Sequence, residues 1–234
     1  MHMLEDLEKY DKRNALMRKE TGMTEAVGSI HKVKDNMAII VAQVDPYLIE
    51  RQNITKCLVK YDDGRHITAH QRKKAYAVIG DIAEYTGNVP EYEKELQKWF
   101  FIERYGGEDF SLSDCSVSTA RDFISYLIDF CFENNIGTRD TLLNNTDDIN
   151  RYLYSCLANR KCAVCNKKAE IHHCEGSRVG MGFNRRKIDN IGRYAIALCR
   201  KCHHTGHNDE KGFFDKYHIY GIRLDKYLVD KLGL

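Results

Sequence analysis

The sequence predicts an α+β protein, with a small sheet and helices in its first two thirds and a metal-binding segment at its end. Three observations predict this class. Short β-rich runs lie between residues 28 and 61, helical periodicity dominates residues 67–160, and two Cys-x2-Cys pairs follow from residue 162 onward. We therefore expect three parts: a charged helix or arm (residues 1–27), a sheet-and-helix domain (28–157) and a metal-binding domain (158–234).

The composition is that of a soluble globular protein. The 234 residues are 43% hydrophobic and 30% charged. No apolar run approaches the roughly 20 residues that span a bilayer, and the N-terminal stretch lacks the apolar core of a secretory signal. We expect a cytoplasmic protein without membrane association. In that reducing compartment the nine cysteines do not predict a disulfide framework.

The β-rich runs predict the small sheet. In SIHKVKDNMAIIVAQV (residues 29–44), two such runs are separated by Asp35-Asn36, a turn signal. The stretch NITKCLVKY (residues 53–61) predicts a further strand, which DDG at residues 62–64 closes.

Helices are predicted to follow the sheet. ITAHQRKKAYAVIGDIAEYTG (residues 67–87) carries an apolar stripe and ends at Gly87, a suitable C-terminal cap. Pro90 starts a second helix, whose stripe consists of Tyr92, Leu96, Trp99 and Phe100. We expect the aromatic residues of these helices in the core rather than at a surface that stacks on bases.

Two more helices complete this region. Ser118 is the predicted N-cap of the third helix, whose core face consists of Phe123, Ile124, Leu127, Ile128 and Cys131. The fourth, DDINRYLYSCLANR (residues 147–160), leads directly into the metal-binding segment and links the two halves.

Positive charge is concentrated late in the chain. The net charge is only +2, but residues 158–204 contain eleven Lys or Arg and three Asp or Glu, so this segment carries +8. Such a segment is typical of contact with a phosphate backbone. The alternative is a solvated basic surface.

The cysteine spacing predicts a structural zinc site. Cys162-x2-Cys165 is followed after 33 residues by Cys199-x2-Cys202. Four thiolates from two such turns match tetrahedral zinc, whereas a single pair could also be a redox motif. The ion would hold together the two ends of the segment between the pairs, which has few apolar residues to stabilise it.

The histidines around these pairs predict a second metal site. His172 and His173 are adjacent on a predicted strand, so their side chains point to opposite faces. His203 and His207 are spaced so that a helix stacks both imidazoles on one face. The alternative is that some of them complete the zinc site or lie on the surface, as we expect of His204.

Residues 28 to about 140 resemble the lambda NinB (Orf) family of phage recombination proteins. The likeness lies in the pattern and order of RHITAHQRKKAYAVIGDIAEYTG, WFFIERYG and SVSTARDFISYLIDFCFENNIG. The resemblance implies a sheet with helices, a homodimer, single-stranded DNA binding and cooperation with a recombinase or a single-strand-binding protein. It implies no catalytic residue.

Residues 160–220 resemble the HNH nucleases, whose ββα-metal core combines strand histidines with a metal-binding helix. IHHCEGSRVGMGFNRRKIDN, ALC and HHTGH are similar to the HNH proteins of phages of Gram-positive bacteria. The resemblance implies that His172 is a metal ligand and His173 the general base of the catalytic site. It also implies that His203 and His207 are the remaining ligands.

The middle residue of the HNH motif departs from the family pattern. Tyr194 stands where the family has its asparagine, and Asn190, further upstream, is our candidate. The loop SRVGMGFNRRKIDN has glycines that allow close backbone approach. Its basic residues are predicted to hold DNA phosphates: Arg178, Arg185, Arg186 and Lys187. The alternative for this loop is a flexible connector.

These features predict a metal-dependent HNH DNA endonuclease that acts in phage recombination or replication in a bacterial host cell. Phosphodiester hydrolysis needs a base for the attacking water and a cation for the anionic transition state. We expect structural Zn²⁺, catalytic Mg²⁺ or Mn²⁺, and single-stranded or branched DNA as substrate. One alternative is a non-catalytic single-stranded-DNA-binding mediator with a zinc knuckle, although pure binding needs none of the four histidines. Another is a zinc-dependent scaffold, which the +8 segment disfavours.

Overall fold

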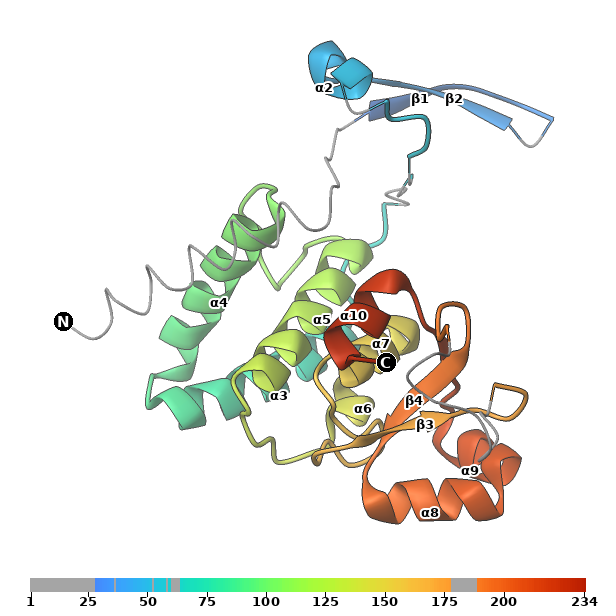
Figure 1. The fold of residues 1–234 in the computed structure, drawn as a ribbon. Helices are drawn as coiled ribbons and strands as arrows, with labels where there is room; N and C mark the ends of the chain where they lie inside the picture. Colours follow the sequence, from blue (N-terminus) through green and yellow to red (C-terminus); the bar gives the residue numbers. More distant parts are fainter. Residues whose placement is uncertain (1–27, 36, 52, 58, 60–63, 178–188) are drawn as a thin grey trace. The chain divides into compact units, whose positions relative to one another are not determined.

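The computed structural model describes residues 28–35, 37–51, 53–57, 59, 64–177 and 189–234 (Figure 1). The contacts divide the chain into two compact units, residues 1–61 and 62–234. The described residues form a mixed α+β fold, as the sequence predicts. The domain boundaries predicted after residues 27 and 157 stay predictions. No helix in the described part is long and apolar enough to cross a bilayer.

The first unit contains the predicted hairpin. Strands β1 (Gly28–Lys34) and β2 (Met37–Ala42) pair antiparallel, and Asp35 between them has a positive φ of 49°. Helix α2 (Pro46–Arg51) follows. The strand predicted over residues 53–61 is wrong: its described residues form no strand. They are mostly exposed, and none of them pairs with β1 or β2. Without hydrogen bonds to a neighbouring strand, these residues have no sheet to join.

The second unit begins with three helices whose buried hydrophobic side chains form a core (Figure 1). Helix α3 (Ala69–Thr86) starts at a Thr68–Gln71 capping box and ends at Gly87, as predicted. Helix α4 is Pro90–Tyr105, and α5 (Val117–Glu133) is capped by Ser116 rather than Ser118. The predicted core face of α5 is confirmed, because each of its five members is at most 1% exposed.

The predicted stripe of α4 is wrong. Tyr92 and Trp99 are 56% and 50% exposed and Leu96 and Phe100 are half-buried, whereas the helix buries Phe101 together with Glu93 and Gln97. These polar groups are buried without a large penalty because they are hydrogen-bonded. The Gln97 amide donates to Glu93, and its carbonyl oxygen accepts from the hydroxyl of Tyr126 on α5.

The C-terminal part of this unit is a three-stranded sheet with helices on it. The strands are β3 (Glu170–His173), β4 (Tyr194–Leu198) and β5 (Ile222–Arg223), in the order β3-β4-β5 and antiparallel. The helices of this part are α6 (Leu142–Asn145), α7 (Ile149–Ala158), α8 (Arg200–Asn208), α9 (Glu210–Tyr217) and α10 (Lys226–Leu232).

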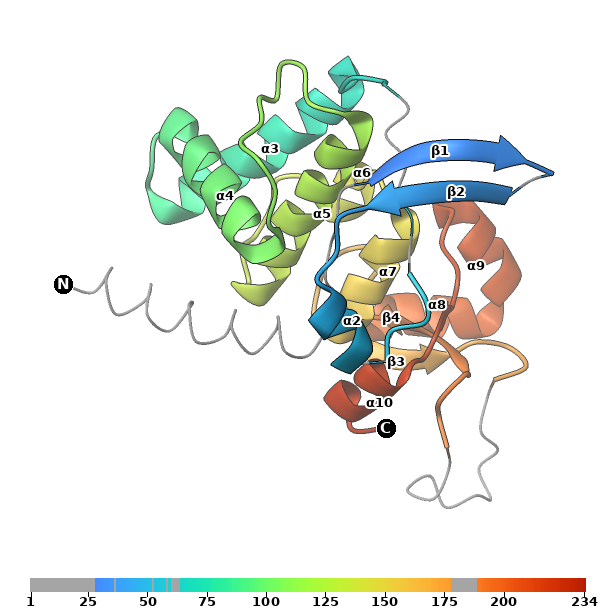
Figure 2. The same ribbon diagram turned by 90° about the horizontal axis from the view of Figure 1, so that it is seen from above.

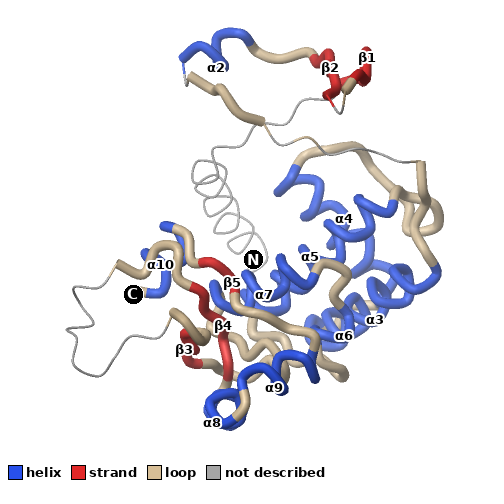
Figure 3. Tube along the Cα trace, turned by 90° about the vertical axis from the view of Figure 1, so that its right-hand side faces the viewer, coloured by secondary structure: helices blue, strands red, loops and turns tan. Residues whose placement is uncertain are grey.

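Helix α8 positions the histidines. It packs against β3 and β4 to form a ββα arrangement, and α7 also packs on β4 (Figures 2 and 3). The helix begins at Cys199, its N-cap, directly after β4 ends at Leu198. The contact with β3 therefore brings the helix histidines to the strand histidine.

Candidate active site and metal centres

The four predicted zinc ligands lie together. The Sγ atoms of Cys162, Cys165, Cys199 and Cys202 are all within 4.8 Å of one another, and those of Cys165 and Cys199 are 3.6 Å apart. Cys162 and Cys165 belong to a tight turn closed by the bridge between Lys161 and Lys168. Four convergent thiols without other ligand types suit tetrahedral zinc.

The protonation of these thiols also bears on metal binding. Burial raises the pKa of the Cys165 thiol to about 11. Zinc binds thiolates, so binding would displace protons from the cluster. We therefore expect zinc affinity to rise with pH.

Three of the predicted histidines form a second cluster. His172 from β3 meets His203 and His207 from α8, and their ligand nitrogens are within 4.8 Å of one another. The ring centroids are 4.9 Å apart for His172 and His203, and 4.7 Å for His172 and His207. The helical spacing places the two α8 rings one turn apart, with centroids 4.6 Å apart.

Two carboxylates accept hydrogen bonds from histidines of this cluster. Glu210, the first residue of α9, accepts from Nε2 of His172 at 2.9 Å and from the amide of Glu175 at 2.7 Å. Glu170 accepts from Nδ1 of His203 at 3.1 Å. A carboxylate on one ring nitrogen fixes the orientation of the imidazole and directs its other nitrogen towards an ion.

His172 fits the role of a metal ligand. Its side chain is fully buried, and burial lowers its pKa, so the ring stays neutral as metal binding requires. Its Nδ1 is buried and has no hydrogen-bond partner within the described residues. Such an orphaned nitrogen costs stability unless another group satisfies it. Together with two more imidazoles, it suits a divalent ion.

The surface beside the cluster is basic and open. A shallow depression along α8 is lined by Glu170, Arg200, Lys201, His203, His204, Thr205, His207 and Asn208. The cluster can therefore be approached from solvent on the side of the two α8 histidines, next to the Arg200 and Lys201 cations.

Comparison with known protein families agrees with this geometry. The family model described as "Putative HNHc nuclease" matches residues 39–233. The chain belongs to this HNH nuclease family. Comparison with curated proteins and with solved structures found no match. The family match covers most of the helical region as well as the two metal clusters.

The other predicted residues of the HNH site lie outside the histidine cluster. His173 is half-buried at the end of β3, and successive strand residues point to opposite faces. Asn190 is buried in the turn before β4, where its carbonyl accepts from the Arg193 amide. Their roles as base and middle residue stay predictions. The DNA-binding residues Arg178, Arg185, Arg186 and Lys187 lie outside the described residues.

Sequence reasoning missed the two carboxylates that are hydrogen-bonded to the histidine cluster. Glu170 could have been found, because it is two residues before His172 and so shares its strand face. The signal for Glu210 was weaker. It follows His207 by three residues, but a new helix starts there, and only packing shows that it turns back to β3.

Proposed function

We propose that this protein is a metal-dependent DNA endonuclease of the HNH type. The observation that carries the proposal is the convergence of His172, His203 and His207, with a buried nitrogen of His172 left for a ligand. A divalent ion such as Mg²⁺ or Mn²⁺ at these histidines would act as a Lewis acid towards the phosphate and the leaving oxygen. The four-cysteine cluster would hold structural zinc.

In this proposal the chain's own residues supply the rest of the chemistry. His173 takes a proton from the attacking water as the water oxygen bonds to phosphorus and the P–O bond to the leaving oxygen breaks. Asn190 is the proposed middle residue of the motif. Arg178, Arg185, Arg186 and Lys187 hold the phosphates on either side. Glu210 and Glu170 keep the ligand rings oriented.

The biological setting is also proposed. We propose that the enzyme acts in the cytoplasm of a bacterial host during phage DNA recombination or replication, on single-stranded or branched DNA. The support is the sequence resemblance of residues 28–140 to the NinB family. The same resemblance supports a homodimer that cooperates with a recombinase or a single-strand-binding protein.

The decisive experiment replaces His173 by alanine. Wild type should cut single-stranded, duplex or branched DNA with Mg²⁺ or Mn²⁺ and stop when EDTA is added. His173→Ala should lower turnover by roughly 10²–10⁴, because a base acts only during the reaction. DNA affinity and zinc content should stay unchanged. The matched control is His204→Ala, which changes a neighbouring exposed histidine.

Two outcomes would contradict the proposal at different levels. If His173→Ala cuts as fast as wild type, the base is another residue. If wild type cuts no DNA with any divalent ion yet binds single strands tightly, the protein is the non-catalytic recombination mediator instead.

A further inference from the structure

The hairpin of the first unit has two edges that no other described strand covers. Strands β1 and β2 form a two-stranded sheet of their own and lie side by side in Figure 2. Every residue of the two strands is exposed except Ile40, which is half-buried. A two-stranded hairpin is at best marginally stable in water, and an independent sheet needs three or more strands with an apolar face. Further strands would therefore stabilise this hairpin.

The two edges differ in how they are protected against pairing. On β1, Lys32 and Lys34 are charged, and the register with β2 shifts between Ile30 and Lys32, as at a β-bulge. Charged side chains and bulges keep edge strands from pairing with other chains. The sequence of β2, MAIIVA, contains no charged residue, no proline and no glycine, and its residues pair with β1 without a break along β2. The edge of β2 is therefore the one that is open to another strand.

The side chains on one face of the hairpin are also distributed unevenly between the strands. Residues directly opposite each other in an antiparallel pair lie on the same face. The opposed pairs on this face are Lys34 and Met37, Lys32 and Ile39, and Ser29 and Val41. The apolar row of this face therefore lies along the open edge, on β2, and the polar row lies on β1.

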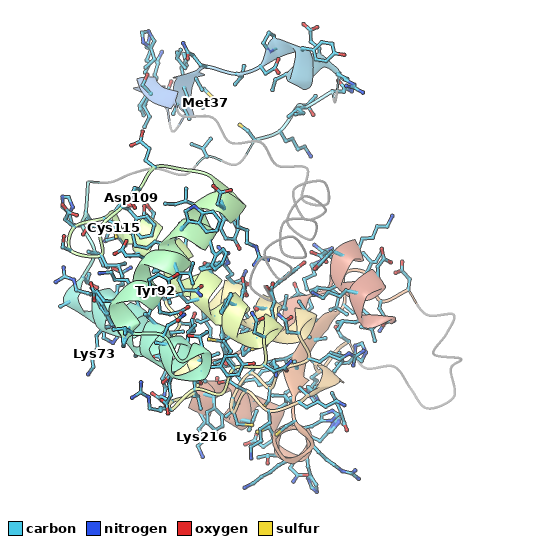
Figure 4. The ribbon with its side chains drawn as sticks, turned by 90° about the vertical axis from the view of Figure 1, so that its left-hand side faces the viewer. Met37, Lys73, Tyr92, Asp109, Cys115 and Lys216 are labelled. Carbon is cyan, nitrogen blue, oxygen red and sulfur yellow. The ribbon has the colours of Figure 1, made fainter. Side chains whose placement is uncertain are left out.

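This apolar row is fully available to a partner within the described residues. Met37, Ile39 and Val41 are 70%, 56% and 57% exposed. Figure 4 labels Met37 among the side chains of the hairpin. Protein interfaces combine an apolar centre with a polar rim. An apolar row at the open edge, with lysines on the far strand, is half of such an arrangement.

We propose that the open edge of β2 pairs with β2 of a second copy of this chain. Around a two-fold axis the two copies of β2 run antiparallel, so each strand offers the other the same backbone groups, and the contact closes on itself. The result is a four-stranded sheet in the order β1-β2-β2-β1. The two apolar rows meet at its centre, and the lysines stay on the outer strands.

The absence of charge on β2 favours a second copy over a partner of strong charge. A basic or acidic partner would be matched by charges of the opposite sign at this edge, and β2 has none. For the same reason, pairing two copies of β2 brings no like charges together. The proposal rests on the homodimer of the proposed function and names the strand that forms its interface, but it does not require that the protein cleaves DNA.

Analytical ultracentrifugation of the zinc-loaded full chain, without DNA and at several protein concentrations, tests the proposal. Wild type should reach twice the mass of one chain. Ile39→Lys places two lysines close to the two-fold axis, because Ile39 lies at the middle of β2. Like charges facing each other across an interface oppose association, so the dimer dissociation constant should rise at least about 10-fold.

The matched control is Val33→Lys, which introduces the same charge at an exposed apolar position of β1. Its dissociation constant should equal that of wild type. Hydrogen exchange in wild type adds a measurement that does not depend on how a variant folds. A higher protein concentration should slow the exchange of the amides of β2 but not of the amides of residues 53–57, which form no strand.

Three outcomes would overturn the proposal. One is a wild type that stays monomeric at every concentration. Another is a dimer that Ile39→Lys leaves intact, or that Val33→Lys weakens equally, because its interface then lies elsewhere. The third is exchange in β2 that does not depend on concentration. Failure of DNA cleavage would overturn the nuclease proposal and leave these results intact.

Discussion

At the scale of single residues, Glu210 connects helix α9 to the histidine cluster. Its two carboxylate oxygens accept from His172 and from the backbone after β3, so one side chain ties α9 to the strand that carries a ligand. Its side chain is only 11% exposed, which limits competition from water. We infer that it positions His172 rather than binding the ion.

Replacing Glu210 by glutamine tests this role. The neutral amide loses the charge-assisted bond to the imidazole and can present a donor to it. Outer partners of metal-binding histidines typically contribute 10- to 100-fold in affinity, so Mn²⁺ binding measured by calorimetry should weaken by about that factor. Glu108→Gln, which changes an exposed glutamate, should bind Mn²⁺ like wild type. Unchanged affinity in Glu210→Gln would show that packing alone orients His172.

At the scale of elements, the cysteine cluster connects the turn before β3 to the start of α8. The turn is also attached to the helices: the Asn166 side chain accepts from the Leu142 amide at 2.7 Å and donates to the hydroxyl of Tyr152 at 2.7 Å. Because Cys199 is the N-cap of α8, an ion bound there would fix the helix that carries His203 and His207. The cysteine cluster and the histidine cluster are thus connected through α8.

The Cys199→Ser variant tests whether zinc at the cysteine cluster stabilises the fold around α8. Elemental analysis should find about one zinc in wild type and none in the variant. Zinc in small folded sites contributes up to roughly 10–16 kcal/mol, and about 1 kcal/mol shifts Tm by 2–4 °C in units of this size. We therefore expect Tm to fall by at least about 10 °C. Cys57→Ser, at an exposed position, serves as the control. A Cys199→Ser protein that melts like wild type would refute the zinc clip.

At the scale of the whole molecule, charge is divided unevenly along the sequence. A net charge of +2 conceals the +8 of residues 158–204, which contain the four clustered cysteines and two of the three clustered histidines. On a nuclease, this segment is the expected contact with the DNA backbone, and its four loop cations are predicted to contact phosphates. Such contacts release counterions, so their number determines how steeply binding depends on salt.

Neutralising the four loop cations should therefore change the salt dependence. The variant replaces Arg178, Arg185, Arg186 and Lys187 by glutamine. Its slope of log K against log salt should be smaller by roughly 3 to 4, with similar losses for unrelated DNA sequences. Anisotropy at four salt concentrations measures this. The control replaces four exposed lysines elsewhere: Lys32, Lys34, Lys226 and Lys231. An unchanged slope would mean that the loop faces away from the DNA.

By itself the sequence determined the features that depend on short spacing. Short spacings in the sequence predict both clusters. These spacings are the two Cys-x2-Cys pairs and the His-x3-His pair that follows the strand histidine, and the structure brings the residues together. The core face of α5 follows from the same helical period. The same spacing predicts two separate metal sites, one with cysteine ligands and one with histidine ligands.

Only the tertiary structure determined which face of each helix is buried and which distant residues its side chains contact. The exposed Trp99 and the bond from Glu210 to His172 both depend on how helices pack across long stretches of chain. An apolar stripe indicates which face could be buried, but another element must be there to cover it. On α4, the buried face combines Phe101, which packs against Phe123 and Tyr126, with Glu93 and Gln97, whose buried polar groups are hydrogen-bonded. Local periodicity carries no information about that choice, because it depends on partners distant in the sequence.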